Sequence, residues 1–179
     1  MKLYPNIQFV VLQDRAMNPH LAAFLDSVAH WRPFTEAVPW GQMHTVRNRA
    51  FRWFLTETAT PWLVMCDVDT VWTEASIPLL ESTADVASAA FARAGDGQDG
   101  HPSTMSVGTI KLSRRAVERL GECWIAPPGP DKCECPAFYQ ACIAAGFEPV
   151  KTGFVGHRVH VTVWPGKVFQ LDSEVRVLK

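Results

Sequence analysis

Apolar runs of strand length alternate with amphipathic helical segments along the chain. The run over 7–12 is rich in β-branched residues and predicts a buried strand, and the run over 62–66 predicts another. Apolar residues at spacings of three and four predict helices that begin near Asn18-Pro19 and at Thr45. The predicted apolar positions are Leu21, Phe24, Leu25 and Val28 in the first helix and Val46, Ala50, Trp53 and Phe54 in the second. Between the two helices, residues 31–43 leave room for one short extended piece at most.

The same alternation continues in the second half of the chain. The predicted elements there are strands over 86–92 and 105–112, helices over 113–121 and 136–146, and one or two strands over 150–163. No internal repeat and no domain boundary interrupts the series. The sequence therefore predicts a single α/β domain over residues 1–179 with a mostly parallel central sheet.

Composition narrows the classes of protein to consider. The 179 residues are 47% hydrophobic, enough to bury a core, and 17 Lys+Arg stand against 18 Asp+Glu. A net charge of −1 argues against a general nucleic-acid binder, which needs a basic excess. The longest apolar stretch, over 86–92, is far shorter than the ~20 residues of a membrane span, and no signal-peptide pattern opens the chain. These features predict a soluble cytoplasmic protein.

The cysteines and tryptophans offer two further hypotheses. An odd number of five cysteines argues against a disulfide framework. Four of them, Cys123, Cys133, Cys135 and Cys142, form a cluster for which structural zinc and plain burial are the alternatives. The seven tryptophans, among them Trp40, Trp72, Trp124 and Trp164, are interpreted mainly as core or rim residues, with stacking on a sugar as the alternative.

Two carboxylates follow directly on the second predicted strand. Asp67 and Asp69 lie two positions apart, so both side chains point to the same side if the strand end is extended. Like charges so close raise each other's pKa unless a cation neutralises them, and oxygen ligands suit Mg²⁺ or Mn²⁺. Ligands of open α/β sheets bind at the carboxyl ends of strands. The alternative interpretation is an Asx-rich turn with no ligand.

Four features in order resemble the nucleotide-sugar-binding half of GT-A fold glycosyltransferases, especially the family 2-like group. They are the helix with Arg47-Asn48 before the strand that ends in Asp67-x-Asp69, the segment over 108–117, Glu134 before a helix, and His157. The resemblance covers roughly residues 44–160. It implies a GT-A-like (Rossmann-like) fold and metal-dependent transfer of a sugar from a nucleotide-sugar, with a UDP-sugar favoured, to an acceptor hydroxyl.

The resemblance also implies roles for individual residues. Asp69 binds the divalent cation, Mn²⁺ or Mg²⁺, directly, and Asp67 contacts the ribose or binds the metal through water. His157 completes the metal ligands, and Glu134 is the general base that deprotonates the acceptor. Arg47 adds a positive contact to the donor phosphates.

Each of these assignments has a structural alternative. His157 lies among valines of a predicted strand and also fits a hydrogen-bonded core histidine, with His160 as the reserve ligand on the opposite face. Glu134 also fits an acidic residue favoured by a helix N-terminus. Asp14 and Arg15, after the first strand, either contact the nucleoside or form a solvated loop.

The chain also departs from the family pattern. Family members usually carry a further strand and helix before the Arg-Asn helix, and only 31–44 is available for them here. Glu134 is followed by Cys135 where the family has Asp.

Two rival functions and a possible assembly complete the sequence hypotheses. A non-catalytic or degenerate nucleotide-sugar or carbohydrate-binding module suits the short chain. The segment over 63–70 also looks like the opening motif of haloacid-dehalogenase-type phosphatases, although its distance from the acidic loop over 95–99 is too short for that family. A homodimer is compatible with the short chain.

Overall fold

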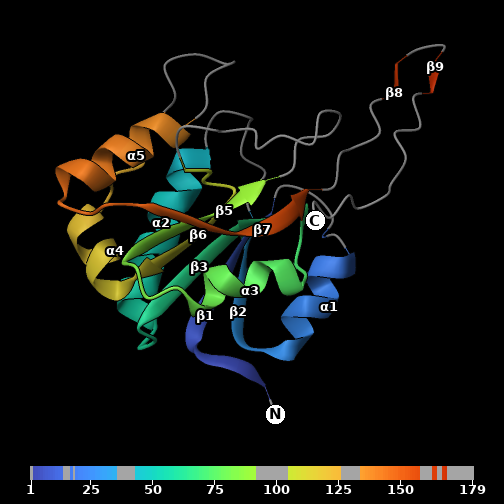
Figure 1. The fold of residues 1–179 in the computed structure, drawn as a ribbon, viewed down its shortest axis with the longest axis horizontal. Coiled ribbons are helices and arrows are strands. Elements are labelled where there is room, and N and C mark those ends of the chain that lie inside the picture. The colour runs from blue at the N-terminus through green and yellow to red at the C-terminus, as the bar shows by residue number, and fades with distance from the viewer. Residues whose placement is uncertain are drawn as a thin grey trace.

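A computed structural model describes residues 2–13, 17, 19–35, 43–91, 105–125, 134–157, 163–164 and 167–168 (Figure 1). The elements are, in chain order, β1 (Leu3–Gln13), α1 (Pro19–Ser27), β2 (Val28–Thr35), α2 (Met43–Glu57), β3 (Trp62–Asp67), β4 (Thr70–Val71), the 3-10 helix η1 (Glu74–Ser76), α3 (Ile77–Glu81), β5 (Val86–Phe91), β6 (Thr109–Ser113), α4 (Arg114–Leu120), α5 (Cys135–Ala144), β7 (Val150–His157), β8 (Val163–Trp164) and β9 (Lys167–Val168). The α/β class predicted from the sequence is confirmed.

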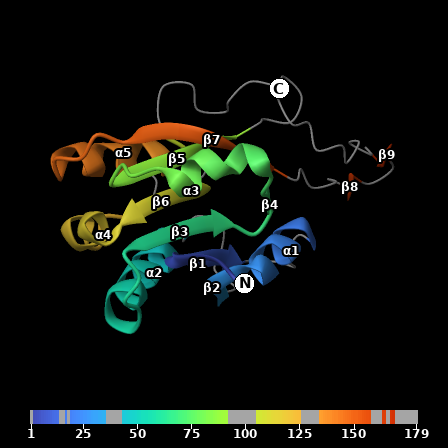
Figure 2. The ribbon, with the colours of Figure 1, turned by 60° about the horizontal axis from the view of Figure 1, so that its bottom comes forward.

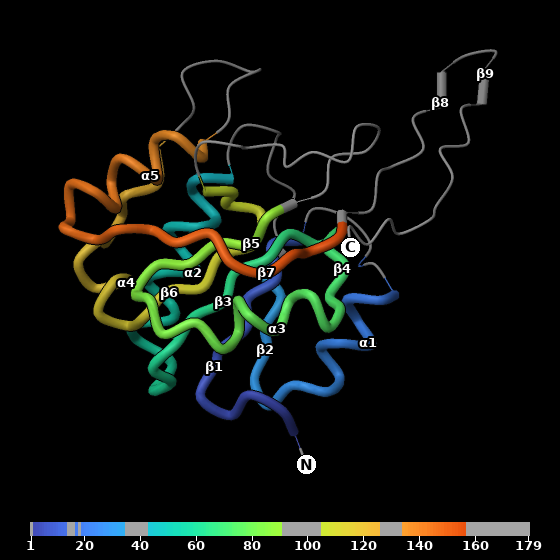
Figure 3. Tube along the Cα trace, viewed as in Figure 1, coloured from blue at the N-terminus to red at the C-terminus, as the bar shows by residue number. Residues whose placement is uncertain are grey.

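Seven strands form one sheet in the order β2-β1-β3-β6-β5-β7-β4, and β8 pairs with β9 separately. Strand β1 is parallel to β2 and β3, and β5 is parallel to β7. Strand β6 lies between β3 and β5 and runs antiparallel to both, and β4 runs antiparallel to β7 (Figure 3). The sheet is therefore mixed, and the prediction of a mostly parallel sheet is wrong. An apolar run reports burial, and a buried strand can join its neighbours in either direction.

Helices cover both faces of this sheet. Alternate residues of β1 enter two different cores: Val10 and Leu12 pack with α2, α4 and α5, whereas Phe9 and Val11 pack with α1 and α3. In Figures 1 and 2, α4 and α5 lie on the left of the view and α1 on the right. This three-layer arrangement explains why the central strands read as continuous apolar runs rather than as alternating ones.

Helix α1 and strand β2 meet without a linker. The helix ends at Ser27, and Val28, predicted to belong to its apolar stripe, instead opens β2 opposite Leu3 of β1. Val28 is buried in either role, so the hydrophobic pattern alone could not place the boundary. After β2, only residues 36–42 separate it from α2. The sequence prediction that a further strand-helix unit has no room there agrees with these bounds.

The segment between β3 and β5 holds elements that the sequence pattern did not predict. Strand β4, η1 and α3 are each five residues long or shorter, too short for a periodic apolar signal. A local signal was present, because Thr73 and Ser76 form a reciprocal capping box at the start of η1. No helix in the described part of the chain is long and apolar enough to cross a membrane.

Candidate functional site

The two carboxylates at the end of β3 and in the turn that follows it occupy different environments. Strand β3 ends at Asp67, whose side chain is 36% exposed, and the chain then turns, so that Asp69 lies in the turn and is 6% exposed. The turn is fixed at both ends: the amide of Asp67 donates to the carbonyl of Gly108 at 2.8 Å, and the hydroxyl of Thr70 donates to the carbonyl of Asp67 at 2.9 Å. The premise that both residues extend from one strand end is therefore wrong.

Strand β4 brings the end of β7 to this turn. It pairs antiparallel with the end of β7, with Thr70 opposite His157 and Val71 opposite Gly156. The backbone of His157 thus lies beside the residue that follows Asp69. The side chain of His157 is outside the described part of the structure. Among the described side chains, no three that could ligate a metal gather in one place.

Strand β1 ends beside the same carboxylates. Its residue Leu12 lies opposite Asp67 in the parallel pairing with β3, and its last residue is Gln13. Asp14 and Arg15 follow directly in the sequence and are outside the described residues. Their predicted contact with a nucleoside is therefore still a prediction.

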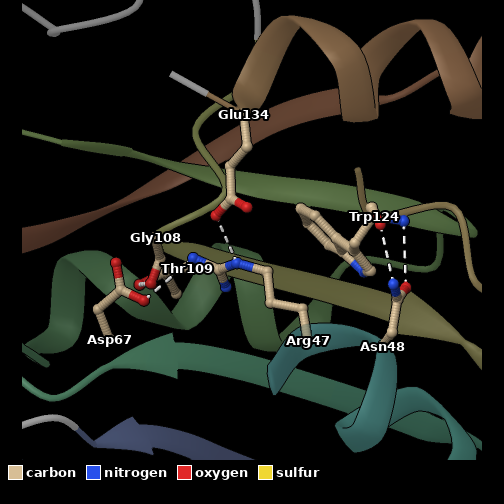
Figure 4. A network of polar contacts seen from close by, with 7 residues as sticks. All are labelled: Arg47, Asn48, Asp67, Gly108, Thr109, Trp124 and Glu134. Carbon is tan, nitrogen blue, oxygen red and sulfur yellow. Dashed lines mark hydrogen bonds and ion pairs between the residues drawn. The ribbon is translucent and has the colours of Figure 1, made fainter. Parts of the chain in front are cut away.

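Arg47 contacts both the carboxylate at the end of β3 and the one just before α5 (Figure 4). Its Nε donates to Oε1 of Glu134 at 2.6 Å, and its Nη2 lies 3.2 Å from Oδ1 of Asp67. The Arg47 side chain is only 3% exposed, against 14% for Glu134. Burial alone would lower the pKa of Arg47, but the carboxylates of Glu134 and Asp67 outweigh it and raise that pKa above its ordinary value.

Glu134 occupies the N-cap position of α5 but does not cap the helix with its side chain. Its carbonyl accepts the amide of Phe138 in the first helical turn, while its carboxylate turns to Arg47. The ion pair therefore positions this side chain. The alternative assignment, an acidic residue favoured by the helix N-terminus, explains its place in the sequence but not its orientation.

Asn48 and Trp124 complete the surroundings of Arg47. The sequence had indicated Asn48 only as part of the Arg-Asn helix, and it had offered stacking on a sugar as the alternative for Trp124. The side-chain amide of Asn48 makes two hydrogen bonds to the backbone of Trp124. The Trp124 ring stacks on Phe138 with 3.9 Å between centroids and lies 5.1 Å from Cζ of Arg47. Trp124 is buried, which excludes its face from stacking on a sugar, and its interpretation as a core residue is confirmed together with that of Trp72.

The cysteine cluster falls partly outside the described residues, which do not include Cys133. Cys135 and Cys142 are buried, and burial raises the pKa of Cys142 and of Cys123 to about 12. Among the described residues, Cys123, Cys135 and Cys142 form no group that could hold a metal ion. This environment favours burial over the zinc alternative for the described cysteines.

Comparison with known proteins gives a fold likeness at low sequence identity. No protein-family model matches the chain, and no curated protein matches it. The crystal structure of A197 from STIV aligns with 100% of this chain and 98% of its own, at 13% identity and a TM-score of 0.59. A glycosyltransferase involved in the glycosylation of the major capsid of PBCV-1 aligns with 63% of this chain and 62% of its own, at 13% identity and a TM-score of 0.41.

A further solved structure is that of glucosyl-3-phosphoglycerate synthase from Mycobacterium tuberculosis, in complex with Mn²⁺, UDP and phosphoglyceric acid. It aligns with 86% of this chain and 71% of its own, at 15% identity and a TM-score of 0.45. The two glycosyltransferase scores do not by themselves establish a shared fold. The likeness to A197 spans both chains and shows that this arrangement of strands and helices occurs in another protein.

Proposed function

We propose that the chain is a metal-dependent glycosyltransferase that moves a sugar from a nucleotide-sugar to an acceptor hydroxyl. One observation carries the proposal: at the carboxyl end of β3, the guanidinium of Arg47 contacts both Asp67, from the predicted metal-binding pair, and Glu134, the predicted base. Ligands of open α/β sheets bind at such strand ends. This shared contact supports a single site for the residues that the resemblance assigns to the nucleotide-sugar and to the acceptor.

The candidate metal ligands near the turn after β3 suit a hard divalent cation. Asp69 and Asp67 supply carboxylates within one turn, and the β4–β7 pairing brings His157 next to them along the backbone. Carboxylates and an imidazole are suitable ligands for Mn²⁺, and carboxylates for Mg²⁺. When bound, the cation would neutralise the charge that develops on the leaving diphosphate.

Glu134 has the chemistry of a general base in this arrangement. Arg47 contacts its Oε1, and the second carboxylate oxygen would take the proton of the acceptor hydroxyl. As that proton leaves, the acceptor oxygen bonds to the anomeric carbon, and the bond from this carbon to the diphosphate breaks. A single base and a direct displacement would invert the anomeric configuration.

Arg47, Asp14 and Arg15 have binding roles in the proposal. The Nη1 of Arg47 is buried and has no hydrogen-bond partner among the described residues. This N–H group would therefore contact the diphosphate of the nucleotide-sugar. Asp14 and Arg15 would contact the nucleoside, since they follow the strand that ends beside Asp67. A UDP-sugar as donor, a cytoplasmic location and a homodimer are further proposals that rest on the sequence alone.

The test is a ligand-binding melt followed by a turnover assay. The melting temperature is measured with UDP, GDP, CMP and their sugar conjugates, each with Mn²⁺ and with EDTA, for the wild type and Asp69→Asn. Asp26→Asn, which alters an exposed carboxylate of α1, is the matched control. A ligand at about 100 times its Kd adds roughly 2.7 kcal/mol, or several degrees.

A shift that one nucleotide family gives only with Mn²⁺, and that Asp69→Asn alone removes, supports the donor site. Release of free nucleotide from the sugar conjugate then tests catalysis, and Glu134→Gln should lose turnover even at saturating Mn²⁺, where the shift persists. If the wild type binds the nucleotide-sugar but turns it over with none of a panel of acceptors, the result favours the non-catalytic binding module. If no nucleotide changes the melting temperature, the transferase proposal is contradicted. Phosphatase activity is then the next function to assay.

A further inference from the structure

We propose that Arg47 is a positioning residue that couples the metal-binding carboxylate Asp67 to the predicted base Glu134. Both carboxylates share its one guanidinium, so cation binding at Asp67 depends on the charge of Glu134. The inference rests on the proposed function only for the presence of a divalent cation at Asp67. It assigns Arg47 a second role, distinct from contact with a phosphate.

The two contacts of the guanidinium are unequal. Its Nε approaches Glu134 to 2.6 Å, at the short end of charge-assisted hydrogen bonds, whereas its Nη2 is 3.2 Å from Asp67, at the long end. Asp67 is also the more exposed partner, at 36% against 14%. Asp67 is therefore the carboxylate that an incoming cation can draw away from Arg47 at the smaller cost.

Arg47 cannot replace a lost carboxylate contact by moving its guanidinium into solvent. Its side chain is 3% exposed, and the Trp124 ring packs 5.1 Å from its Cζ. That ring is itself held, because Asn48 bonds the Trp124 backbone and Phe138 stacks on its face. A buried guanidinium that loses both carboxylates is left without a counter-charge, which is strongly unfavourable.

The charge of Glu134 therefore determines how readily Asp67 is released. With Glu134 ionised, Arg47 keeps one close partner while Asp67 binds the cation. With Glu134→Gln, Asp67 is the sole remaining carboxylate bonded to Arg47 among the contacts described, and a cation must compete with it. Mn²⁺ binding should then weaken by about tenfold or more, which corresponds to ~1.4 kcal/mol.

The test is a double-mutant cycle on Mn²⁺ affinity, read from the electron paramagnetic resonance signal of free aqueous Mn²⁺. The four proteins are the wild type, Glu134→Gln, Arg47→Met and the double variant. Glu134→Gln should weaken Mn²⁺ binding by about tenfold in the wild type but by less than about threefold in the Arg47→Met background. The matched control is the same cycle with Glu122→Gln and Arg52→Met. These two residues form an exposed ion pair whose arginine also lies in α2, and the cycle should leave the Mn²⁺ affinity unchanged.

The outcomes separate the coupling from the proposed function. An equal loss of affinity in both backgrounds shows that Glu134 acts on the cation through space, which overturns the coupling and leaves the metal site standing. No Mn²⁺ binding by the wild type overturns the coupling and the metal site together. Where Arg47→Met does not fold, as judged by circular dichroism, Arg47→Gln replaces it, because its neutral amide keeps N–H donors but does not hold the two carboxylates by charge. An undiminished effect of Glu134→Gln in that background also contradicts the coupling.

Discussion

The side-chain amide of Asn48 and the backbone of Trp124 form a closed pair of hydrogen bonds. Nδ2 of Asn48 donates to the Trp124 carbonyl at 2.8 Å, and the Trp124 amide donates to Oδ1 at 3.1 Å. Because Asn48 lies in α2, this pair ties the segment after α4 to the helix that carries Arg47. The Trp124 ring is thereby fixed against Phe51 and Phe138.

Asn48→Ala should lower the free energy of unfolding by about 1–3 kcal/mol, because two backbone groups of Trp124 lose their partners. Gln140→Ala, which removes an amide from an exposed position of α5, is the control and should change stability little. Urea denaturation measures both. Equal, small effects of the two substitutions would mean that the Trp124 backbone finds other partners.

Arg47 and Arg52 lie on the same helix and differ in burial. Arg47→Met leaves two carboxylates without their shared buried cation and should cost about 3 kcal/mol of unfolding free energy or more. Arg52→Met breaks a contact with Glu122 whose side chains are 60% and 57% exposed, and it should cost about 0.2–1 kcal/mol. Chemical denaturation of the two variants under one buffer gives the comparison. A cost for Arg47→Met no larger than that for Arg52→Met contradicts the burial argument.

Lys111 of β6 gives the stability a pH dependence in the alkaline range. Its Nζ donates to the carbonyls of Leu80 and Ser82 at 2.6 Å each, and burial lowers its pKa from 10.5 to about 8. Between these two pKa values the unfolded chain binds a proton that the folded chain has lost, so the free energy of unfolding rises with pH. Relative to Lys111→Met, the wild type should therefore gain stability from pH 8 to pH 10.

Urea denaturation of the wild type and Lys111→Met at several values from pH 7.5 to 10 gives this difference and cancels the other titrating groups. The slope should be positive in the wild type minus variant curve. A flat or falling curve would show that the folded pKa of Lys111 is not below its unfolded value.

Gly153 and Gly146 both adopt positive φ, at 71° and 81°, but only Gly153 packs closely. A Cβ on Gly153 would lie 3.1 Å from the carbonyl oxygen of Ala75 and from the amide nitrogen of Leu79, both backbone atoms. The nearest atom to a Cβ on Gly146 is 3.9 Å away. Alanine should cost about 1–2 kcal/mol of backbone strain at either position, with a further loss at Gly153 alone.

Thermal or urea unfolding of Gly153→Ala and Gly146→Ala tests this difference. Since β7 carries His157, Gly153→Ala should also weaken Mn²⁺ binding, whereas Gly146→Ala should not. Equal destabilisation of the two variants would indicate that β7 can move away from η1 and α3.

Local patterning determined most of the elements. The apolar runs that became β1 and β3 and the three-and-four spacing that became α2 report which residues leave water, and this property is fixed by the residues themselves. The α/β class and the place of Asp67 at a strand end followed from it. The same pattern misplaced Val28, because a buried valine suits a helix and a strand equally, and it could not detect β4 and α3, which are too short for a period.

Only the tertiary structure decided which of these residues meet. The direction of β6, the ion pairs of Arg47 with Glu134 and Asp67, and the approach of His157 to the turn after β3 depend on pairings between distant segments. Hydrophobic periodicity records the burial of each segment but not its neighbour, strand direction or register. Those properties are set by the packing of the whole sheet, and they place the carboxylates of this site around one buried arginine.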